Sequence, residues 1–441
     1  MSLKFEKPAP ALQVQQAQPR QQNTGTYKPI EFSNIGLPPG PPIIGLPGMP
    51  IGVQYNPQSK GPPPLEVPGA NLKRAVNYYA DYGGCGWWRM IAPELLINLN
   101  QTGVICGLTT MVVDPRFYQG MNAVRLQRQA TPIQLEFVRF LKAGSAKFGF
   151  KTIYEIDDII FKDDIPLFNR CRVAFENEDI FNSSLEMMKL CDEVCVTCEY
   201  MKQYYIEKTG NKNITVIPNY PAKMWFDNRY NEKKIMENYD KNKKRPRILY
   251  AGSGTHIDVT NRTNQQDDFS GIVQFIIKTR NKFKWVFVGC FPLPCKPFID
   301  RGEMEFIQWY PLKDLPKAYI DTNPTAVYAP LMDCTFNKAK SNIKFLEAGC
   351  CGIPGVFQDL VTYKDSFLRF KTGSDLINQL EVLLKDENTY ADYSRKSRAY
   401  AETMWLDDHL EEFQELYFTR IGDPNRKALI KLNPDQDMLA K

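Results

Sequence analysis

Short apolar runs alternate with longer amphipathic stretches along most of this chain. From residue 75 onward, runs rich in Val, Ile, Tyr and Phe are followed by Gly, Pro or Asn and then by helical periodicity, which is typical of βα units. We predict helices at 93–98, at 132–148, through the 340s and over 390–419. We predict strands at 75–80, 107–113, 152–156, 193–197, 214–218, 247–252, 285–289, 305–309, 326–330 and 355–357. The alternation indicates parallel sheets covered by helices.

The pattern stops and restarts once, which predicts two domains. The first block ends near Trp225, a linker rich in Lys, Asn and Glu follows, and the alternation resumes at Arg247. We therefore expect an α/β protein with two Rossmann-like, doubly wound domains that face a cleft, because such folds bind ligands beyond the carboxyl ends of their strands. The expected divisions are 1–72, an extended or disordered Pro-rich arm; 73–235, the N-terminal domain; 236–400, the C-terminal domain; and 401–441, a closing helix and tail.

Composition narrows the class of protein. Of the 32 prolines, 15 fall in residues 1–72, which is why that arm is expected to lack a packed core. No apolar run approaches the ~18 residues that a membrane helix needs. The eleven cysteines lie inside predicted strands and helices, which favours reduced thiols and a cytoplasmic location. The spacing of Cys191, Cys195 and Cys198 suits core thiols better than zinc, and the net charge of +5 permits an anionic partner without requiring one.

The stretch from Asn337 to Asp359 carries the strongest chemical signal. Lys340 and Ser341 fall where a predicted helix opens, Lys344 follows one turn later, and Glu347 comes at the next i+3 step. A helix N-terminus presents free amide hydrogens and the positive end of the helix dipole, so it attracts anions. Two lysines and a serine there suit a diphosphate, and the carboxylate suits a pair of sugar hydroxyls. The alternative for these side chains is a solvated helix face.

A glycine turn follows the first strand of the second predicted domain. Gly254 lets the backbone approach a phosphate closely, while Ser253 and Thr255 offer hydroxyl donors and Arg262 adds charge. The alternative is a tight turn with a helix cap. His256, one of two histidines in the chain, is expected in the same site, with a simple satisfied polar residue as the alternative.

Two further groups are expected on the first domain. Asp157 and Asp158 follow a strand and are expected to orient a hydroxyl or contact a cation; helix capping by Asp158 is the alternative. If the strand persisted, at most one of them could face inward. Gly84 and Gly86 lie in a glycine loop that can approach a ligand, and Arg89 behind them is expected to contact phosphate.

Four motifs in order resemble one enzyme family. They are Glu155-Ile-Asp-Asp158, Tyr250-Ala-Gly-Ser-Gly-Thr-His256, Trp309-Tyr-Pro-Leu-Lys-Asp-Leu-Pro316, and Ala329-Pro-Leu-Met-Asp333 running into Asn337–Glu347. Over residues 75–410 the chain is similar to retaining glycosyltransferases of the GT-B type, in the family-4-like group with bacterial and phage members. The resemblance implies that Tyr310 joins the donor site. It also implies that Glu347 binds the donor ribose, while the first glutamate of the family's usual pair is replaced by Ala339.

The resemblance implies transfer of a sugar from a nucleotide-diphosphate donor, UDP-sugar favoured, to an acceptor hydroxyl. No obligatory metal or other cofactor is expected, because the two predicted domains, residues 73–400, contain no metal-binding Asp-x-Asp triplet. Hydroxymethylated cytosine in phage DNA is the expected acceptor, in the host cytoplasm if the protein is phage-encoded. The phosphate backbone would be met by Arg125, Arg128, Arg139, Lys142 and Lys147, unless these are solvated helix faces. Surface polysaccharide or protein acceptors, and a non-catalytic nucleotide-sugar-binding module, are the alternatives, and the Pro-rich arm is expected to bind a protein partner.

Overall fold

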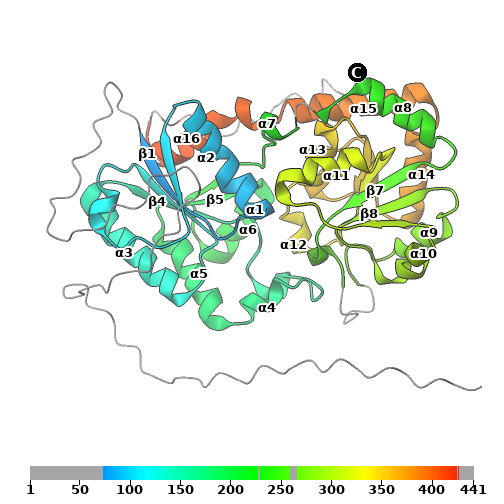
Figure 1. Cartoon of the computed structure of the whole chain (residues 1–441). Helices are drawn as coiled ribbons and strands as arrows, with labels where there is room; N and C mark the ends of the chain where they lie inside the picture. The colour runs from blue at the N-terminus through cyan, green and yellow to red at the C-terminus, as the bar shows by residue number, and fades with distance from the viewer. Residues whose placement is uncertain (1–72, 227–228, 259–265, 425, 427–441) are drawn as a thin grey trace, which may run out of the picture. The chain divides into compact units, whose positions relative to one another are not determined.

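Two parallel sheets organise the chain (Figure 1). The computed structural model describes residues 73–226, 229–258, 266–424 and 426, all within one compact unit. The predicted Pro-rich arm, residues 1–72, and the candidate Arg262 lie outside the described residues.

The first sheet has the strand order β2-β1-β3-β4-β5-β6, with every neighbouring pair parallel. In this order the chain reverses direction across the sheet between β1 and β3, so the loops after these two strands diverge and leave room for a ligand. The strands are β1 (Arg74–Tyr78), β2 (Val104–Leu108), β3 (Ala123–Gln127), β4 (Lys151–Glu155), β5 (Glu193–Val196) and β6 (Ile214–Val216).

The second sheet has the order β12-β11-β10-β7-β8-β9 and is also parallel throughout. The chain changes direction across this sheet between β7 and β10, so a second potential ligand position lies there. The strands are β7 (Arg247–Ala251), β8 (Lys284–Val288), β9 (Glu305–Ile307), β10 (Ala326–Ala329), β11 (Gly355–Gln358) and β12 (Arg369–Phe370). The expected pair of doubly wound domains is confirmed.

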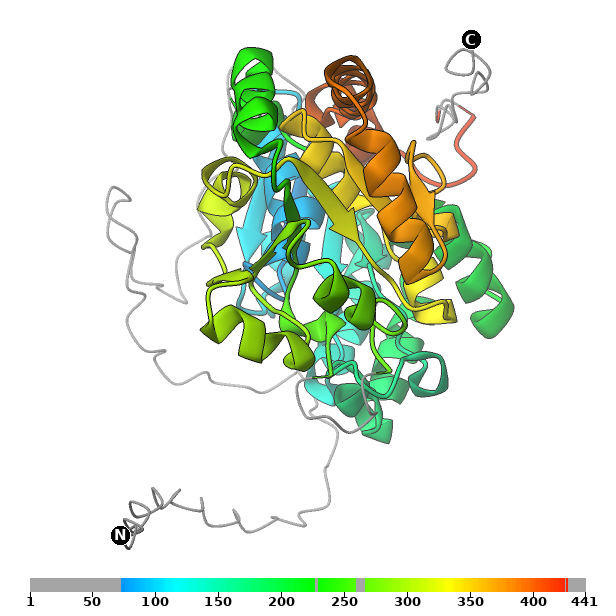
Figure 2. The same cartoon turned by 90° about the vertical axis from the view of Figure 1, so that its right-hand side faces the viewer.

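Helices cover the faces of both sheets, as a second view shows (Figure 2). The α-helices up to the second sheet are α1 (Gly84–Gly86), α2 (Ala92–Leu99), α3 (Pro132–Phe148), α4 (Arg172–Phe175), α5 (Glu178–Leu190), α6 (Glu199–Thr209), α7 (Lys223–Phe226) and α8 (Glu232–Asn242). Those that follow are α9 (Val273–Lys278), α10 (Lys296–Asp300), α11 (Leu315–Asp321), α12 (Thr335–Lys338), α13 (Ile343–Cys350), α14 (Gly373–Leu383), α15 (Glu387–Glu402) and α16 (Leu410–Phe418). A π-helical turn, Trp87–Ile91, joins α1 to α2.

Shorter 3₁₀ turns connect several elements. They are Pro115–Tyr118, Lys162–Asp164, Gly254–His256, Leu293–Cys295, Leu312–Asp314, Val361–Tyr363 and Leu406–Asp408. The predicted 390–419 segment is two helices, α15 and α16. Although α16 follows the second sheet in sequence, it packs on α2 and β3 of the first, where Figure 1 draws it beside α2.

Helix α3 shows why the clearest predicted element has the expected bounds. Thr131 accepts a hydrogen bond from the Gln134 amide while the Gln134 side chain returns to the Thr131 amide, and Pro132 fills the first helical position. Gly149 ends the helix at φ 81°, a left-handed conformation that glycine adopts without steric cost.

Two sequence predictions in the first sheet were wrong. The second strand is 104–108 rather than 107–113, and β3 was not predicted at all. Strand β3 reads Ala-Val-Arg-Leu-Gln, and its polar residues Arg125 and Gln127 are fully buried. Arg125 is neutralised by Glu155 on the neighbouring strand, so a buried ion pair hid the strand from a hydrophobicity pattern.

Candidate functional site

The segment between α12 and α13 holds the first pair of predicted donor residues. Helix α13 begins at Ile343, two residues later than the pattern suggested, so Lys340 and Ser341 precede the helix. Lys340 Nζ lies 3.6 Å from Asp158 Oδ1 and 4.6 Å from the Phe336 ring centre. Burial opposes the charge on Lys340, but Asp158, Asp268 and other nearby acidic groups together outweigh burial and raise the pKa of Lys340.

Lys344, on the first turn of α13, is 8% exposed, so the alternative of a solvated side chain is wrong. Its Nζ lies 3.3 Å from His256 Nε2 and 5.3 Å from the Tyr250 ring centre. Burial, and then the charge of Lys340, lower the pKa of Lys344. An anion bound beside Lys340 and Lys344 would oppose both causes, because a nearby negative charge raises the pKa of a lysine.

Asp268 holds the His256 ring through Nδ1, the ring nitrogen that does not contact Lys344. Its Nδ1 lies 2.7 Å from Asp268 Oδ2, so the tautomer that satisfies both contacts carries its hydrogen on Nδ1 and accepts from Lys344 at Nε2. Burial and the charge of Lys344 lower the pKa of His256 to about 4, which keeps the ring neutral at pH 7. The imidazole therefore directs the Lys344 ammonium.

Asp268, which the sequence did not single out, ties this site together. Its Oδ1 accepts hydrogen bonds from the Met332 amide at 2.9 Å and from Asn337 Nδ2 at 2.6 Å. Asp268 lies on the stretch after β7, while Met332 and Asn337 follow β10. One carboxylate thus spans the point where the second sheet changes direction, and its other oxygen holds His256.

Glu347 lies one turn beyond Lys344 and is 6% exposed, which excludes a solvated helix carboxylate. The Tyr319 hydroxyl donates a hydrogen bond to Glu347 Oε2 at 2.6 Å. Burial raises the pKa of Glu347 to about 7, even though Tyr319 and Lys344 both favour its ionised form. Tyr319, on α11, thus contacts a candidate residue and was not predicted from the sequence.

The glycine turn after β7 is shaped by close packing. A Cβ at Gly252 would lie 2.3 Å from the Tyr250 hydroxyl, so only glycine fits there. Ser253 Oγ and Thr255 Oγ1 lie 2.8 Å apart, and Ser253 is exposed. Gly254 and Thr255 belong to the 3₁₀ turn that ends at His256, so the predicted turn leads directly to the Lys344 contact.

Tyr310, the remaining predicted donor residue, is half-buried in the loop after β9. It packs against the apolar cluster that includes Leu315 and Tyr319. Tyr310 and Tyr319 thus belong to the same apolar cluster, and no hydrogen bond joins Tyr310 to the other described candidates.

On the first sheet, β4 ends at Glu155, so Asp157 and Asp158 are not strand residues and both face Arg128. Arg128 lies 3.5 Å from Asp157 and 4.0 Å from Asp158, and it also pairs with Asp81. Burial raises the pKa of Asp157 against the charge of Arg128. The capping role considered for Asp158 is wrong, because the next helical turn has Phe161 as its N-cap.

In the glycine loop after β1, one glycine has space for a side chain and another has none. Gly84 is exposed, with no atom within 4 Å of a Cβ built on it. Gly86 is buried, and a Cβ there would lie 2.0 Å from the Asp81 carbonyl oxygen. Asp81 Oδ1 also accepts hydrogen bonds from the Gly83 and Gly86 amides, so it fixes the loop.

Arg89 is fully buried and its guanidinium points into the protein. Its Nε donates to Glu155 Oε1 at 2.6 Å, and one terminal nitrogen donates to the Ile217 carbonyl at 2.6 Å and to Asn219 Oδ1 at 3.0 Å. The Arg125 side chain pairs with the other Glu155 oxygen. Arg89 thus has protein partners where a phosphate was expected.

The other first-domain cations considered for a phosphate backbone also have partners. Arg139 pairs with Glu136 and Glu186, and Lys142 with Asp192. Lys147 Nζ lies 5.3 Å from the Phe148 ring centre.

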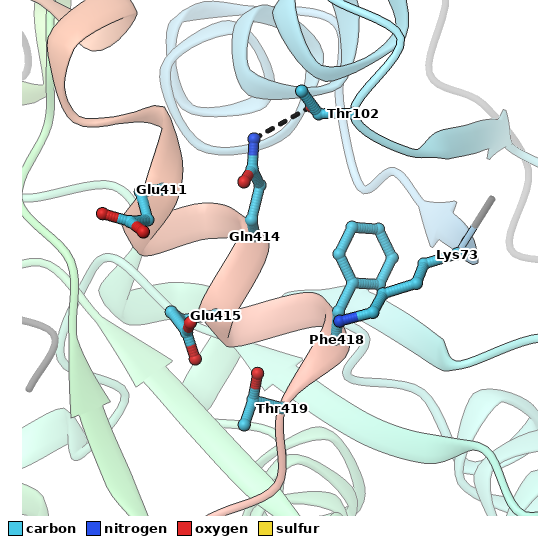
Figure 3. Close-up of a pocket in the computed structure, with 7 residues that line it drawn as sticks. All are labelled: Lys73, Thr102, Glu411, Gln414, Glu415, Phe418 and Thr419. Atoms are coloured by element: carbon cyan, nitrogen blue, oxygen red, sulfur yellow. Dashed lines mark hydrogen bonds between the residues drawn. The ribbon is translucent and has the colours of Figure 1, made fainter. Parts of the chain in front are cut away.

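Two hollows lie outside the α13 region. One, of about 220 Å³, is lined by residues of α16 and its neighbours, with Gln414 donating to Thr102 (Figure 3), and contains no candidate residue. The other, of about 50 Å³, is lined mainly by apolar side chains and borders Arg128 and Asp158. Within the described residues, no three His, Cys, Asp or Glu side chains are grouped as metal ligands, and Cys191 and Cys195 are buried core thiols.

The fold is that of GT-B glycosyltransferases, as comparison with solved structures shows. Anabaena HepE in complex with UDP is 11% identical, with a TM-score of 0.51 over 78% of this chain and 99% of that one. Its complex with UDP-glucose gives 10% identity and a TM-score of 0.51 over 78% and 100%. An alpha-glucosyltransferase in complex with UDP and a 13-mer DNA containing an HMU base is 13% identical, with a TM-score of 0.49 over 79% and 99%.

No protein-family model matches this chain, and no curated protein matches it in sequence. At these identities the structural likeness establishes the two-domain fold alone. Among the described helices, none combines the length and the apolar character needed to cross a bilayer.

Proposed function

We propose that this protein transfers a sugar from a nucleotide-diphosphate donor, with UDP-sugar favoured, to an acceptor hydroxyl. One observation carries the proposal: Lys340 and Lys344 both lie beside the start of α13, and Lys344 is buried against a neutral imidazole and an aromatic ring. Two shielded cations at the carboxyl end of a parallel sheet, next to a helix N-terminus, suit a diphosphate.

The donor would bind along the first turns of α13. The diphosphate takes the two lysines and the Ser341 hydroxyl, with Ser253 and Thr255 offering hydroxyls from the opposite loop. Glu347 then meets the ribose hydroxyls, as the family resemblance implies. Supporting this role, its carboxylate is buried and oriented by Tyr319, so it is fixed before a ligand arrives.

The chemistry breaks the bond between the anomeric carbon and the diphosphate oxygen and forms one to the acceptor oxygen. Negative charge grows on the leaving diphosphate, and Lys340 and Lys344 stabilise it in a site shielded from water. Retention of configuration follows if the acceptor attacks on the face that the diphosphate leaves, with the departing phosphate accepting the acceptor proton. His256 acts through Lys344, whose ammonium it orients.

Asp157 and Asp158 are proposed to orient the acceptor hydroxyl. Asp157 Oδ1 is buried 3.5 Å from Arg128 Nε and has no hydrogen-bond partner among the described residues, so it has a lone pair for a hydroxyl that reaches it. Carboxylates at this position favour a neutral hydroxyl compound over duplex DNA. The ion pairs of Arg128, Arg139 and Lys142 also argue against duplex DNA, because each of these cations already has a carboxylate partner. Sugar or protein acceptors are thus preferred to hydroxymethylated cytosine.

The test is nucleotide release from a panel of UDP- and GDP-sugars, with oligosaccharides and hydroxymethylated DNA as acceptors. Lys344→Met should reduce turnover about 100-fold, the size expected when one charge-stabilising donor is lost. Lys282→Met is the matched control, because Lys282 is half exposed and pairs with Glu381 on the surface. Unchanged turnover in Lys344→Met would refute the donor site. Donor binding without transfer to any acceptor would favour the non-catalytic module.

A further inference from the structure

Three consecutive residues before α13 each contact the first-sheet half of the protein. The contacts are Cys198 Sγ to the Ala339 carbonyl at 3.3 Å, Lys340 Nζ to Asp158 Oδ1 at 3.6 Å, and Asn219 Nδ2 to Ser341 Oγ at 2.8 Å. Their first-sheet partners follow three different strands, β5, β4 and β6. Residues 339–341, which include the proposed diphosphate-binding side chains, are therefore each held by a residue of the first-sheet half.

Asn219 is the partner whose geometry is most restricted. It is 6% exposed, and its Oδ1 accepts a hydrogen bond from Arg89 at 3.0 Å. Because a guanidinium only donates, this contact fixes which end of the amide is oxygen and turns Nδ2 toward Ser341. Arg89 is itself held by Glu155, so the chain of contacts runs Glu155, Arg89, Asn219, Ser341.

The direction of the last hydrogen bond has a chemical consequence. A serine hydroxyl has one hydrogen to donate and two lone pairs that accept. Asn219 Nδ2 can only donate, so it occupies a lone pair of Ser341 Oγ and leaves the hydroxyl hydrogen free for another acceptor. Beside Lys340, the acceptor that fits is a phosphate oxygen.

We propose that Asn219 is a positioning residue for the donor diphosphate, and that it sets the Ser341 hydroxyl to donate to a phosphate oxygen. The inference rests on the proposed function, since it needs the diphosphate at the start of α13. The proposal also gives Arg89 an indirect role. Arg89 was expected to contact phosphate; instead it orients the Asn219 amide, which in turn orients the Ser341 hydroxyl.

Asn219→Asp tests the proposal. The carboxylate keeps an acceptor for Arg89, so the folded state should survive with a melting temperature close to that of the wild type. The Ser341 hydroxyl would then donate to the introduced carboxylate rather than to phosphate, and a negative charge would stand near the diphosphate. We expect the UDP dissociation constant, measured by calorimetry, to rise at least about 10-fold, while the uridine dissociation constant stays within about twofold.

Two further variants keep the test decisive. Asn211→Asp makes the same exchange in the loop before β6, where the side chain donates to the Met188 carbonyl, and should leave the ratio of UDP to uridine affinity unchanged. Ser341→Ala should reproduce the UDP-specific loss. The double variant should lose little more than Asn219→Asp alone, because that single variant already lacks the hydrogen bond from Ser341 to phosphate.

The outcomes separate the two proposals. A wild-type protein that binds UDP no better than uridine would overturn the donor site, and the role of Asn219 with it. A wild type that prefers UDP, with Asn219→Asp and Ser341→Ala both keeping that preference, would overturn the role of Asn219 alone. Additive losses in the double variant would also contradict it.

Discussion

The two sheets change direction in the same way but carry opposite charge at that point. In the first, Arg128 after β3 faces three carboxylates, Asp81, Asp157 and Asp158. In the second, Lys344 contacts the neutral His256, which Asp268 holds, and the charge of Lys340 lowers the pKa of Lys344. The topology leaves room for a ligand at each point. The local side chains are the reason for proposing an anion at the second point and a neutral hydroxyl at the first.

The first region also carries charge that serves the fold. In the same sheet, Glu155 lies between Arg89 and Arg125, and all three are fully buried. Burial works against the ionised Glu155, but Arg125 and Arg89 more than compensate and lower its pKa. Glu155 thus pairs with two positive charges, whereas the nearest partner of Lys344 is a neutral imidazole.

The largest expected effect comes from removing the negative charge of Glu155 from between Arg89 and Arg125. Glu155→Gln keeps the shape of the side chain but leaves two buried guanidinium groups without a counter-charge. Such a loss costs about 3–5 kcal/mol of unfolding free energy. The measurement is chemical denaturation at pH 7.

Glu186→Gln is the control for that experiment. Glu186 pairs with Arg139, and the two side chains are 43% and 45% exposed, so the same exchange should cost about 0.5 kcal/mol or less. Equal stability of Glu155→Gln and the wild type would show that the buried charges of the first region do not hold it together.

A smaller effect should appear at Glu347 and depend on pH. Burial raises its folded-state pKa from 4.5 to about 7, so folding favours the protonated acid. For a raised acid pKa, the stability is fully present below the unfolded pKa and is lost as the pH rises through the folded one. The wild type should therefore lose roughly 2 to 3 kcal/mol relative to Glu347→Gln between pH 5 and pH 8.5.

Melting or denaturation curves of both proteins at the two pH values measure this difference. Glu381→Gln, at an exposed surface pair with Lys282, should follow the wild type at both. A gap between wild type and Glu347→Gln that stays constant with pH would mean that burial does not raise the pKa of Glu347 in the folded protein.

The same contrast explains how far the sequence could predict the molecule. The second sheet was predicted nearly strand for strand, because strands such as Trp285-Val-Phe-Val are continuously apolar and lie buried on both faces. The residues around α13 were singled out as candidates because lysines and a glutamate at helical spacing beside a glycine turn suit a phosphate-containing ligand. Strand β3 was missed because Arg125 and Gln127 look solvent-exposed until their buried partners are known.

Partners distant in sequence were beyond prediction for the same reason. Asp268, Tyr319 and Asn219 are single polar residues with no motif around them. Each becomes important only through a contact that the fold creates, to His256, Glu347 and Ser341 respectively. Arg89 was found as a candidate, but its orientation depends on Glu155, 66 residues away.

The smallest expected effect separates packing from ligand approach within one loop of the first region. At Gly86 an added methyl group would meet the Asp81 carbonyl oxygen at 2.0 Å, so Gly86→Ala must shift the backbone and should cost about 2 kcal/mol of unfolding free energy. At Gly84 the same methyl group meets nothing within 4 Å, so stability should change by about 0.5 kcal/mol or less. If the loop faces a bound sugar, Gly84→Ala should nevertheless slow transfer. Full transfer activity in Gly84→Ala would place the sugar away from this loop, and full stability in Gly86→Ala would show that Asp81 does not fix it.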